Sequence, residues 1–258
     1  MSLGAGNLLL ASAGDTGYNL TRSLRFRRSA SAYLNRTPAS ASNRKTWTWS
    51  GWVKLGDISS SAIMVLLGSG DGTTNNYTRL QFASNQITLL NAISATNYGQ
   101  ITTTAVYRDP SAWYHVVVAI NTTNATAANR AIIYINGVQA TSTINTTFVS
   151  SSDTWINSAN AQYISRQSYS PQDYLDGYLA EVNFIDGQAL TPSSFGSYNA
   201  LTGVWQAARF VGTYGTNGFY LPFTDNSALT TSSNVGLGKD FSGNGNYWTT
   251  NNISLTAG

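Results

Sequence analysis

The sequence predicts an all-β protein, an antiparallel jelly-roll β-sandwich with N- and C-terminal extensions. Short runs rich in Val, Ile, Tyr, Phe and Trp recur along the chain, and loops of Gly, Asn, Ser and Thr separate them. No long segment has the 3.6-residue periodicity of an amphipathic helix. Because a parallel sheet needs helical crossovers, the strands are expected to pair antiparallel.

The composition excludes several classes of protein. The chain has 258 residues, of which 42% are apolar and 10% charged, and it contains no cysteine and one histidine. Zinc ribbons, disulfide scaffolds and cysteine nucleophiles are therefore excluded, and a Ser-His-Asp site would have to use His115. The longest early apolar run, Leu8–Ala11, is far shorter than a membrane span or a signal sequence, so no membrane insertion is expected.

Two segments in the first half of the chain predict long strands. In residues 46–54 polar and apolar side chains alternate, which places Trp47, Trp49 and Val53 on one face of a half-buried strand. Residues 113–120 are apolar on both faces, so this strand is expected to lie centrally with both sides covered. His115 in that strand is then a packed residue rather than a catalytic base.

The next elements are a hairpin, a further strand and one short helix. Asn136-Gly137 separates residues 130–135 from 138–140, and this dipeptide is typical of a type I′ hairpin turn. Residues 178–185 predict another strand, which ends at Asp186-Gly187. The one credible helix is one or two turns at Thr191–Phe195, with Thr191 as N-cap and Pro192 in first position.

The order of these segments resembles the concanavalin A-like, laminin-G-like jelly-roll family. The similarity covers roughly residues 23–198. It is carried by TWTWSGWVK at 46–54, WYHVV at 113–117, IYINGV at 133–138, DGYLAEV at 176–182 and ALT at 189–191. The resemblance divides the chain into an N-terminal arm (1–22), the jelly roll (23–198) and a C-terminal extension (199–258).

The flanking segments resemble jelly-roll proteins of tailed bacteriophages, especially tail-fibre proteins. The similar residues are 3–9, 25–27, 32–34 and 236–248. This resemblance implies a virion protein that is assembled in the host bacterial cytoplasm and contacts other virion proteins. It also implies a homotrimer, in which the contacts between subunits would cover the sheet edges.

The C-terminal extension carries a second pattern. Residues 219–225 followed by 239–246 look like the opening strand and loop of another laminin-G-like domain. Either a second module is cut short, or these strands complete the first sheet or a neighbour's. Completion is favoured, because about 60 residues bury too little surface to stand alone as a sandwich.

Basic residues gather in a stretch that holds no acid between Asp15 and Asp57. These are Arg22, Arg25, Arg27, Arg28, Arg36, Arg44, Lys45 and Lys54. Such a region could contact nucleic acid or anionic polysaccharide. The favoured interpretation is that outward-facing arginines keep the sheet soluble, because apolar residues interrupt the run. Nucleic acid is not an expected partner, since charge is sparse outside residues 22–54.

The carboxylates do not predict an enzyme. Glycoside hydrolases of this fold need two carboxylates flanking the scissile bond. Glu181 is the one glutamate, and no second acid lies one or two residues from it. Asp173 and Asp176 precede it in a loop, and no G-x-S-x-G motif occurs.

Tyrosines beside amide side chains are the candidate glycan site. Aromatic rings stack on sugar rings, and amides hydrogen-bond to sugar hydroxyls. The candidates are Asn75, Asn76, Tyr77, Tyr98, Tyr163, Tyr169 and Tyr174. The same polar loop makes Asp71 a candidate calcium ligand, although Asp71-Gly72 equally well forms a plain turn. No other cofactor is expected.

Two function classes follow from these observations. In the first, the protein is a tail fibre or tail-associated component whose jelly roll binds host surface glycan. In the second, it decorates the capsid or joins tail parts through protein contacts alone.

Overall fold

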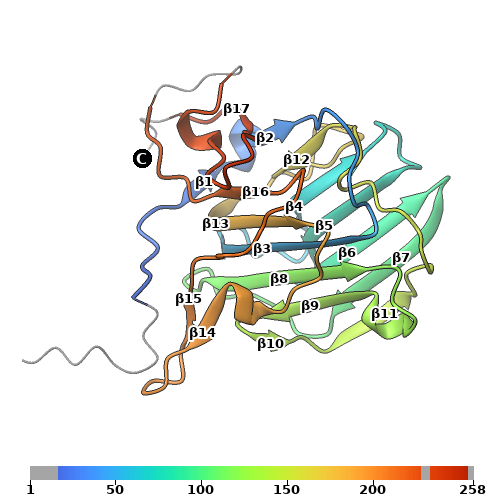
Figure 1. Ribbon diagram of the computed structural model, residues 1–258, viewed down its shortest axis with the longest axis horizontal. Helices are drawn as coiled ribbons and strands as arrows, with labels where there is room; N and C mark the ends of the chain where they lie inside the picture. Colours follow the sequence, from blue (N-terminus) through green and yellow to red (C-terminus); the bar gives the residue numbers. More distant parts are fainter. Residues whose placement is uncertain (1–16, 228–232, 255–258) are drawn as a thin grey trace, which may run out of the picture.

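The computed structural model describes residues 17–227 and 233–254, and within them two antiparallel sheets form a sandwich. Figure 1 shows the two sheets as two layers. The seven-stranded sheet has the order β1 (Leu24–Phe26), β13 (Gly177–Asp186), β3 (Thr46–Leu55), β8 (Tyr114–Asn121), β9 (Ala131–Ile135) and β10 (Val138–Gln139), with β16 (Phe219–Leu221) also paired to β13.

The eight-stranded sheet holds the longest meander of the chain. Its order is β11 (Ser142–Thr146), β7 (Thr96–Thr103), β6 (Gln86–Ile93), β5 (Tyr77–Ala83), β4 (Ile63–Gly70), β12 (Gln162–Ile164), β2 (Tyr33–Arg36) and β17 (Thr249–Asn251). A separate hairpin pairs β14 (Gly196–Tyr198) with β15 (Trp205–Ala207). Four 3₁₀ turns complete the described elements, at Arg28–Ala30, Ala127–Asn129, Pro192–Ser194 and Gly236–Gly238. The predicted all-β antiparallel sandwich is confirmed.

The core lies between the two sheets. Trp47, Trp49 and Val53 of β3 are fully buried there, packed with residues of the eight-stranded sheet such as Phe82 and Leu89. The alternation of residues 46–54 therefore identified the inward face of the strand correctly. Burying rings of this size is the main contribution to the stability of such a core.

The prediction that residues 46–54 form a half-buried strand is wrong for the middle of the strand and holds at Trp52 and Lys54, which are half-buried. Thr48 and Ser50 on the opposite face of β3 are also buried. The chain after β13 folds back over this outer face, where Phe195 and Phe210 pack on Val117 and Ile185 in a second apolar cluster. The central strand β8 is covered on both faces, as predicted.

The predicted hairpin turn and short helix are confirmed, except that Thr191 does not cap the helix. Asn136 and Gly137 have φ of 49° and 84°, the left-handed values that a type I′ turn requires. The predicted helix is a single 3₁₀ turn with Pro192 in first position. Thr191 makes no side-chain cap bond, because its hydroxyl pairs with Ser193 Oγ at 2.9 Å instead.

The C-terminal extension pairs with strands of this same chain. β16 lies against β13, and β17 lies against β2 at the edge of the other sheet. Leu221 and Trp248 are buried in the main core. Of the N-terminal arm, residues 17–22 are described, and the motif at residues 3–9 lies outside the described residues. No helix in the described ranges is long and apolar enough to span a membrane.

Candidate functional site

The loop between β4 and β5 carries Asp71 and the first sequence-predicted glycan residues. Asp71 Oδ1 accepts hydrogen bonds from Thr73 N at 2.9 Å and Thr73 Oγ1 at 2.6 Å. Asp71 Oδ2 accepts one from Asn76 Nδ2 at 2.7 Å, and Asn76 Oδ1 accepts from Ser94 N. These bonds occupy the oxygens that a calcium ion would need, and the backbone carbonyl of Asn75 already accepts from Ala95 N. In the described part of the chain, no three His, Asp or Glu side chains gather as a metal site would require.

Tyr77 and Tyr169 come together beside this loop. Their ring centroids lie 5.0 Å apart, and the Arg79 guanidinium lies 5.2 Å from the centre of the Tyr77 ring. Arg79 also donates to the Tyr169 hydroxyl at 3.2 Å and to Gln167 Oε1 at 2.9 Å. Both tyrosines are half-buried. We call Tyr77, Tyr169 and Arg79 the rim cluster.

The other predicted tyrosines do not join the rim cluster. Tyr163 and Tyr174 both pack on Tyr33, with ring centroids 6.2 and 6.1 Å from it, and Arg166 covers the Tyr163 ring at 4.5 Å. Tyr174 is buried, so its ring offers no face to a sugar, and the prediction that it is a stacking residue is wrong. Tyr98 lies on β7, two strands away from Tyr77 in the sheet order.

A larger aromatic surface lies on the outer face of the seven-stranded sheet. Trp52 of β3 and Trp113 before β8 together line two adjoining hollows. The first, of about 320 Å³, is closed on one side by residues 20–23 and by Ala180. The second, of about 420 Å³, is closed by Asn136, Tyr198 and Trp205 among others. We call the two hollows the aromatic groove; their sizes are typical of small-ligand sites.

The hairpin β14–β15 brings Trp205 to this groove, and Figure 1 shows the hairpin beside β9 and β10. A Cβ on Gly137 would lie 2.4 Å from the Trp205 ring, and one on Gly196 would lie 2.6 Å from it. Glycine at these two positions therefore lets the indole lie directly on the backbone. Tyr198 packs edge-on against Trp205 at 4.9 Å, and its hydroxyl donates to the carbonyl of Asn136 at 2.7 Å.

His115 forms the floor beneath the tryptophans. Its ring stacks on Trp52 at 5.0 Å and on Trp205 at 5.8 Å between centroids. Trp205 Nε1 donates to His115 Nδ1 at 2.9 Å, so the ring proton is on Nε2 and is donated to Ser50 Oγ, also at 2.9 Å. Burial lowers the pKa of His115 to about 3, which keeps the ring neutral. The prediction of a packed histidine is confirmed.

Sequence analysis missed this groove because its tryptophans resemble core residues. The alternation in β3 contained a usable signal, since Trp52 has the opposite parity to Trp47 and Trp49 and therefore points to the outer face. No local pattern could have placed Trp205 on His115, because the contact spans 90 residues of chain.

Glu181 lies at a β-bulge of β13, where the register with β3 shifts and its own φ is 51°. Its carboxylate accepts hydrogen bonds from Tyr18 at 2.8 Å and Tyr220 at 2.9 Å. Burial raises the pKa of Glu181, and the two hydroxyl donors oppose that shift. A hollow of about 260 Å³ beside it is lined by Arg22 and Arg209 as well. The tie between Tyr18 and Glu181 holds the arm against the sheet.

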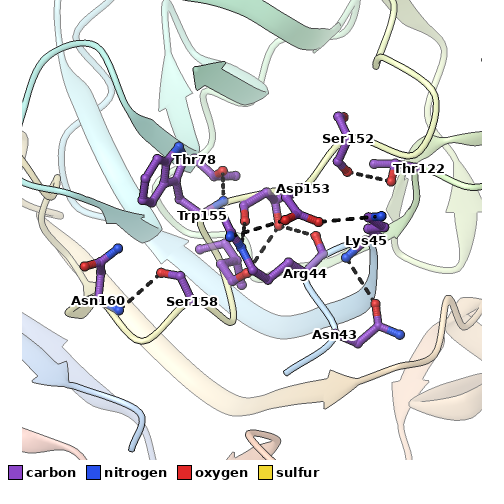
Figure 2. A network of polar contacts seen from close by, with 12 residues as sticks. Asn43, Arg44, Lys45, Thr78, Thr122, Ser152, Asp153, Trp155, Ser158 and Asn160 are labelled. Atoms are coloured by element: carbon purple, nitrogen blue, oxygen red, sulfur yellow. Dashed lines mark hydrogen bonds and ion pairs between the residues drawn. The ribbon is translucent and has the colours of Figure 1, made fainter. Parts of the chain in front are cut away.

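A polar network at one end of the sandwich joins the two sheets. Figure 2 shows Asp153 between Arg44 and Lys45, with N···O distances of 3.3 and 4.0 Å. The Arg44 guanidinium lies 5.3 Å from the Trp155 ring, and Trp155 N donates to Thr78 Oγ1 of β5 at 2.7 Å. This network fixes the loop before β12 between β3 and β5. Arg44 and Lys45, two cations of the basic stretch in residues 22–54, therefore have a structural role.

Comparisons with known proteins give a family and a fold. A family model described as the concanavalin A-like lectin/glucanases superfamily matches residues 28–194. Among solved structures, a proposed carbohydrate-binding protein from Bacteroides ovatus is 16% identical with a TM-score of 0.54, and the match covers 92% of this chain and 60% of that one.

Two further solved structures are similar to this chain at lower TM-scores. Domains LG4-5 of the mouse laminin α1 chain are 13% identical with a TM-score of 0.49, covering 82% of this chain and 52% of that one. A heptameric SAP-like pentraxin from Limulus polyphemus is 16% identical with a TM-score of 0.45, covering 66% and 77%. No sequence among the curated proteins matches this chain. The chain thus spans 60% of the length of the first of these structures.

Proposed function

Because the chain belongs to the concanavalin A-like lectin/glucanase superfamily, we propose that it is a lectin-like module that binds carbohydrate in the aromatic groove. The observation that carries the proposal is the position of Trp52 and Trp113, which line both hollows of the groove. Indole rings offer flat apolar faces to the C–H face of a sugar ring. Asn136 lines the same groove, and because its Oδ1 accepts from His115 N at 2.8 Å, its side-chain amide Nδ2 is the group that would donate to a sugar hydroxyl.

Two aromatic side chains of the groove, Trp205 and Tyr198, are held in place by hydrogen bonds, which favours binding. His115 fixes the Trp205 indole by a hydrogen bond, and the hydroxyl of Tyr198 is bonded to backbone. Side chains that are held in place before a ligand arrives lose little conformational entropy when it binds. The similar protein from Bacteroides ovatus, itself a proposed carbohydrate-binding protein, supports a sugar ligand for this architecture.

The rim cluster is the second candidate for the sugar site. Tyr77 and Tyr169 are half-buried and lie beside the polar loop that holds Asn75 and Asn76. Arg79 already lies against the Tyr77 ring, so one face of that ring is engaged. The aromatic groove has three large indoles, those of Trp52, Trp113 and Trp205, and is therefore preferred.

A pair of matched substitutions decides between the two candidate sites. Trp113→Ala removes a half-buried ring from the groove, and Tyr77→Ala removes one from the rim cluster. Each variant would be screened on a glycan array and then titrated calorimetrically with the tightest-binding oligosaccharide. We expect Trp113→Ala to weaken binding about tenfold or more and Tyr77→Ala to leave it nearly unchanged. The reverse result would move the site to the rim cluster, and no binding by the intact chain to any glycan would refute the proposal.

The proposal is for binding without catalysis. The carboxylate of Glu181 is engaged by two tyrosine hydroxyls and lies in a position that secures the arm. Release of reducing sugar from the bound glycan by the intact chain, lost in Glu181→Gln, would contradict this.

We further propose a setting for this module, a trimeric tail-fibre or tail-associated protein of a bacteriophage virion that attaches to host glycan. The similarity of residues 25–27, 32–34 and 236–248 to phage jelly-roll proteins supports this setting. Capsid decoration through protein contacts alone is the competing role. Light scattering of the intact chain tests the trimer, and a monomer at high concentration would argue against it. Labelled antibody on intact particles distinguishes the tail tip from the capsid surface.

Calcium dependence of the β4–β5 loop stays a prediction from sequence. The loop satisfies its own oxygens, so the residues present fit a calcium site poorly. Titration of the chain with calcium, compared with Asp71→Asn, tests it: heat of binding that the variant lacks would support a site.

A further inference from the structure

Seven of the eight basic residues between residues 22 and 54 fall into two groups in the structure. Arg28 is paired with Asp57 at 2.8 Å, and Arg44 and Lys45 share Asp153. Arg36 is also engaged, since it donates to the Asn217 carbonyl and to Asn246 Oδ1. These four cations are thus engaged in contacts within the fold.

Arg22, Arg25 and Arg27 form the second group. All three are exposed, and none has an ion pair within the described residues. They line one hollow of about 550 Å³ at the edge of the sandwich, between β1 and the residues before the C-terminus. Asn226 and Asn252 line it as well, and none of its lining residues is acidic. We call this hollow the arginine groove.

Three like charges in one groove repel one another, which costs stability unless an anion binds there. If the arginines served solubility alone, they would be expected to be spread over the surface with acids between them. Arginine is also the side chain best suited to carboxylate and sulfate groups, because its planar guanidinium donates two parallel hydrogen bonds.

The arginine groove adjoins the aromatic groove. Arg22 and Ser23 line both the arginine groove and the smaller hollow that holds Trp52 and Trp113. Arg25 lies 5.7 Å from the centre of the Tyr178 ring, and that ring is 6.4 Å from Trp113. A single extended ligand can therefore lie across both.

We infer that the ligand is an anionic polysaccharide, whose sugar rings lie on Trp52 and Trp113 while its carboxylate or sulfate groups contact Arg22, Arg25 and Arg27. This inference rests on the proposed glycan binding at the aromatic groove and specifies the class of glycan. A chain of acidic sugars meets both requirements, because its ring faces are apolar and its charges recur along its length.

The test uses the full chain and four polymers. Polygalacturonate carries carboxylates, dextran sulfate carries sulfates, dextran is the neutral sugar control, and polyglutamate is an anion without sugar rings. We expect one or both acidic polysaccharides to bind more tightly than dextran and polyglutamate, with an affinity that falls as salt is raised. Whichever of the two acidic polysaccharides binds more tightly shows whether the arginines prefer carboxylate or sulfate.

Variants then locate the contact. Arg27→Gln should weaken binding of the acidic polysaccharide about tenfold, the size of one lost charge-assisted hydrogen bond, and the triple Gln variant of Arg22, Arg25 and Arg27 should weaken it further. Arg108→Gln is the matched control, since it removes one exposed charge outside the groove and should change little. Trp113→Ala should weaken polysaccharide binding and leave polyglutamate binding unchanged.

The outcomes distinguish this inference from the proposed function. Binding of neutral glycans that the triple variant retains, without preference for acidic ones, would overturn the inference and leave the proposed function intact. Equal affinity for polyglutamate and for the better-binding acidic polysaccharide would show attraction by charge alone and would also overturn it. Failure of the intact chain to bind any glycan, neutral or acidic, would refute both.

Discussion

Trp205 donates its indole Nε1–H to Nδ1 of His115 across 90 residues of chain, at 2.9 Å. This bond fixes the tautomer of the buried histidine and the orientation of a tryptophan in the aromatic groove. A residue that sequence analysis placed among packed side chains is therefore also a positioning residue for the candidate sugar site.

His115 should make the stability of the fold depend on pH. Its pKa is about 3 in the folded protein, against the ordinary histidine value of 6.5 expected in the unfolded chain, because burial disfavours the charged ring. Below about pH 6.5 the unfolded state binds a proton that the folded state does not, so the free energy of unfolding should fall by about 1.4 kcal/mol per pH unit down to about pH 3. Denaturant unfolding at several pH values measures this slope. His115→Gln is the control, and an equal slope in that variant would contradict the assignment.

Glu181 should show the opposite trend. Burial raises the pKa of Glu181, so the folded state holds its proton to higher pH than the unfolded chain does. Its contribution to stability is then fully present below the unfolded value and is lost as pH rises through the folded value. The free energy of unfolding of Glu181→Gln, relative to that of the wild type, should therefore be higher at neutral pH than at acidic pH. Glycan binding should be unchanged. Unfolding curves of both proteins at the two pH values, with a calorimetric titration, check this; a constant stability difference would show that the carboxyl is not perturbed.

Gly137→Ala should disturb both the β9–β10 turn and the packing of Trp205 against it. The position has φ of 84°, and a Cβ there would lie 2.4 Å from the indole. Gly72 has nearly the same φ, 88°, but no atom within 4 Å of its Cβ position. We expect Gly72→Ala to cost about 1 kcal/mol for backbone strain, and Gly137→Ala to cost a further 1–3 kcal/mol, roughly the range for overpacking. Denaturation of the two variants followed by tryptophan fluorescence gives the comparison, and equal costs would mean that the indole moves aside freely.

Removal of the C-terminal extension should prevent folding rather than release a smaller soluble domain. A chain ending at Ala200 lacks β16, β17 and the buried Leu221 and Trp248, so it exposes strand edges and core. We expect it to aggregate, while a chain ending at Ser254 keeps every described strand and stays folded. Light scattering and circular dichroism of the two chains decide between these outcomes; a soluble, folded chain ending at Ala200 would show that the extension is dispensable.

The main features of the sandwich could be predicted from sequence because they depend on neighbours in the chain. Alternation in residues 46–54 identified the inward tryptophans, and Asn136-Gly137 predicted a turn whose two positive φ values the structure has. The apolar character of both faces of residues 113–120 placed that strand in the middle of a covered sheet. Period and turn chemistry act over a few residues, so the sequence displays them directly.

The candidate site and the roles of the charges were decided by tertiary structure. Tyr77 and Tyr174 look equivalent in sequence, yet Tyr174 is buried and Tyr77 lies at the rim. Arg27 and Arg28 are adjacent, yet Arg28 is paired with Asp57 while Arg27 lines an open groove. In each case the outcome depends on which distant segment packs against the side chain, as with the hairpin that carries Trp205 onto His115. Composition and periodicity therefore determined this protein's class and strand faces, whereas burial and pairing were determined by contacts between residues far apart in the chain, which no local pattern encodes.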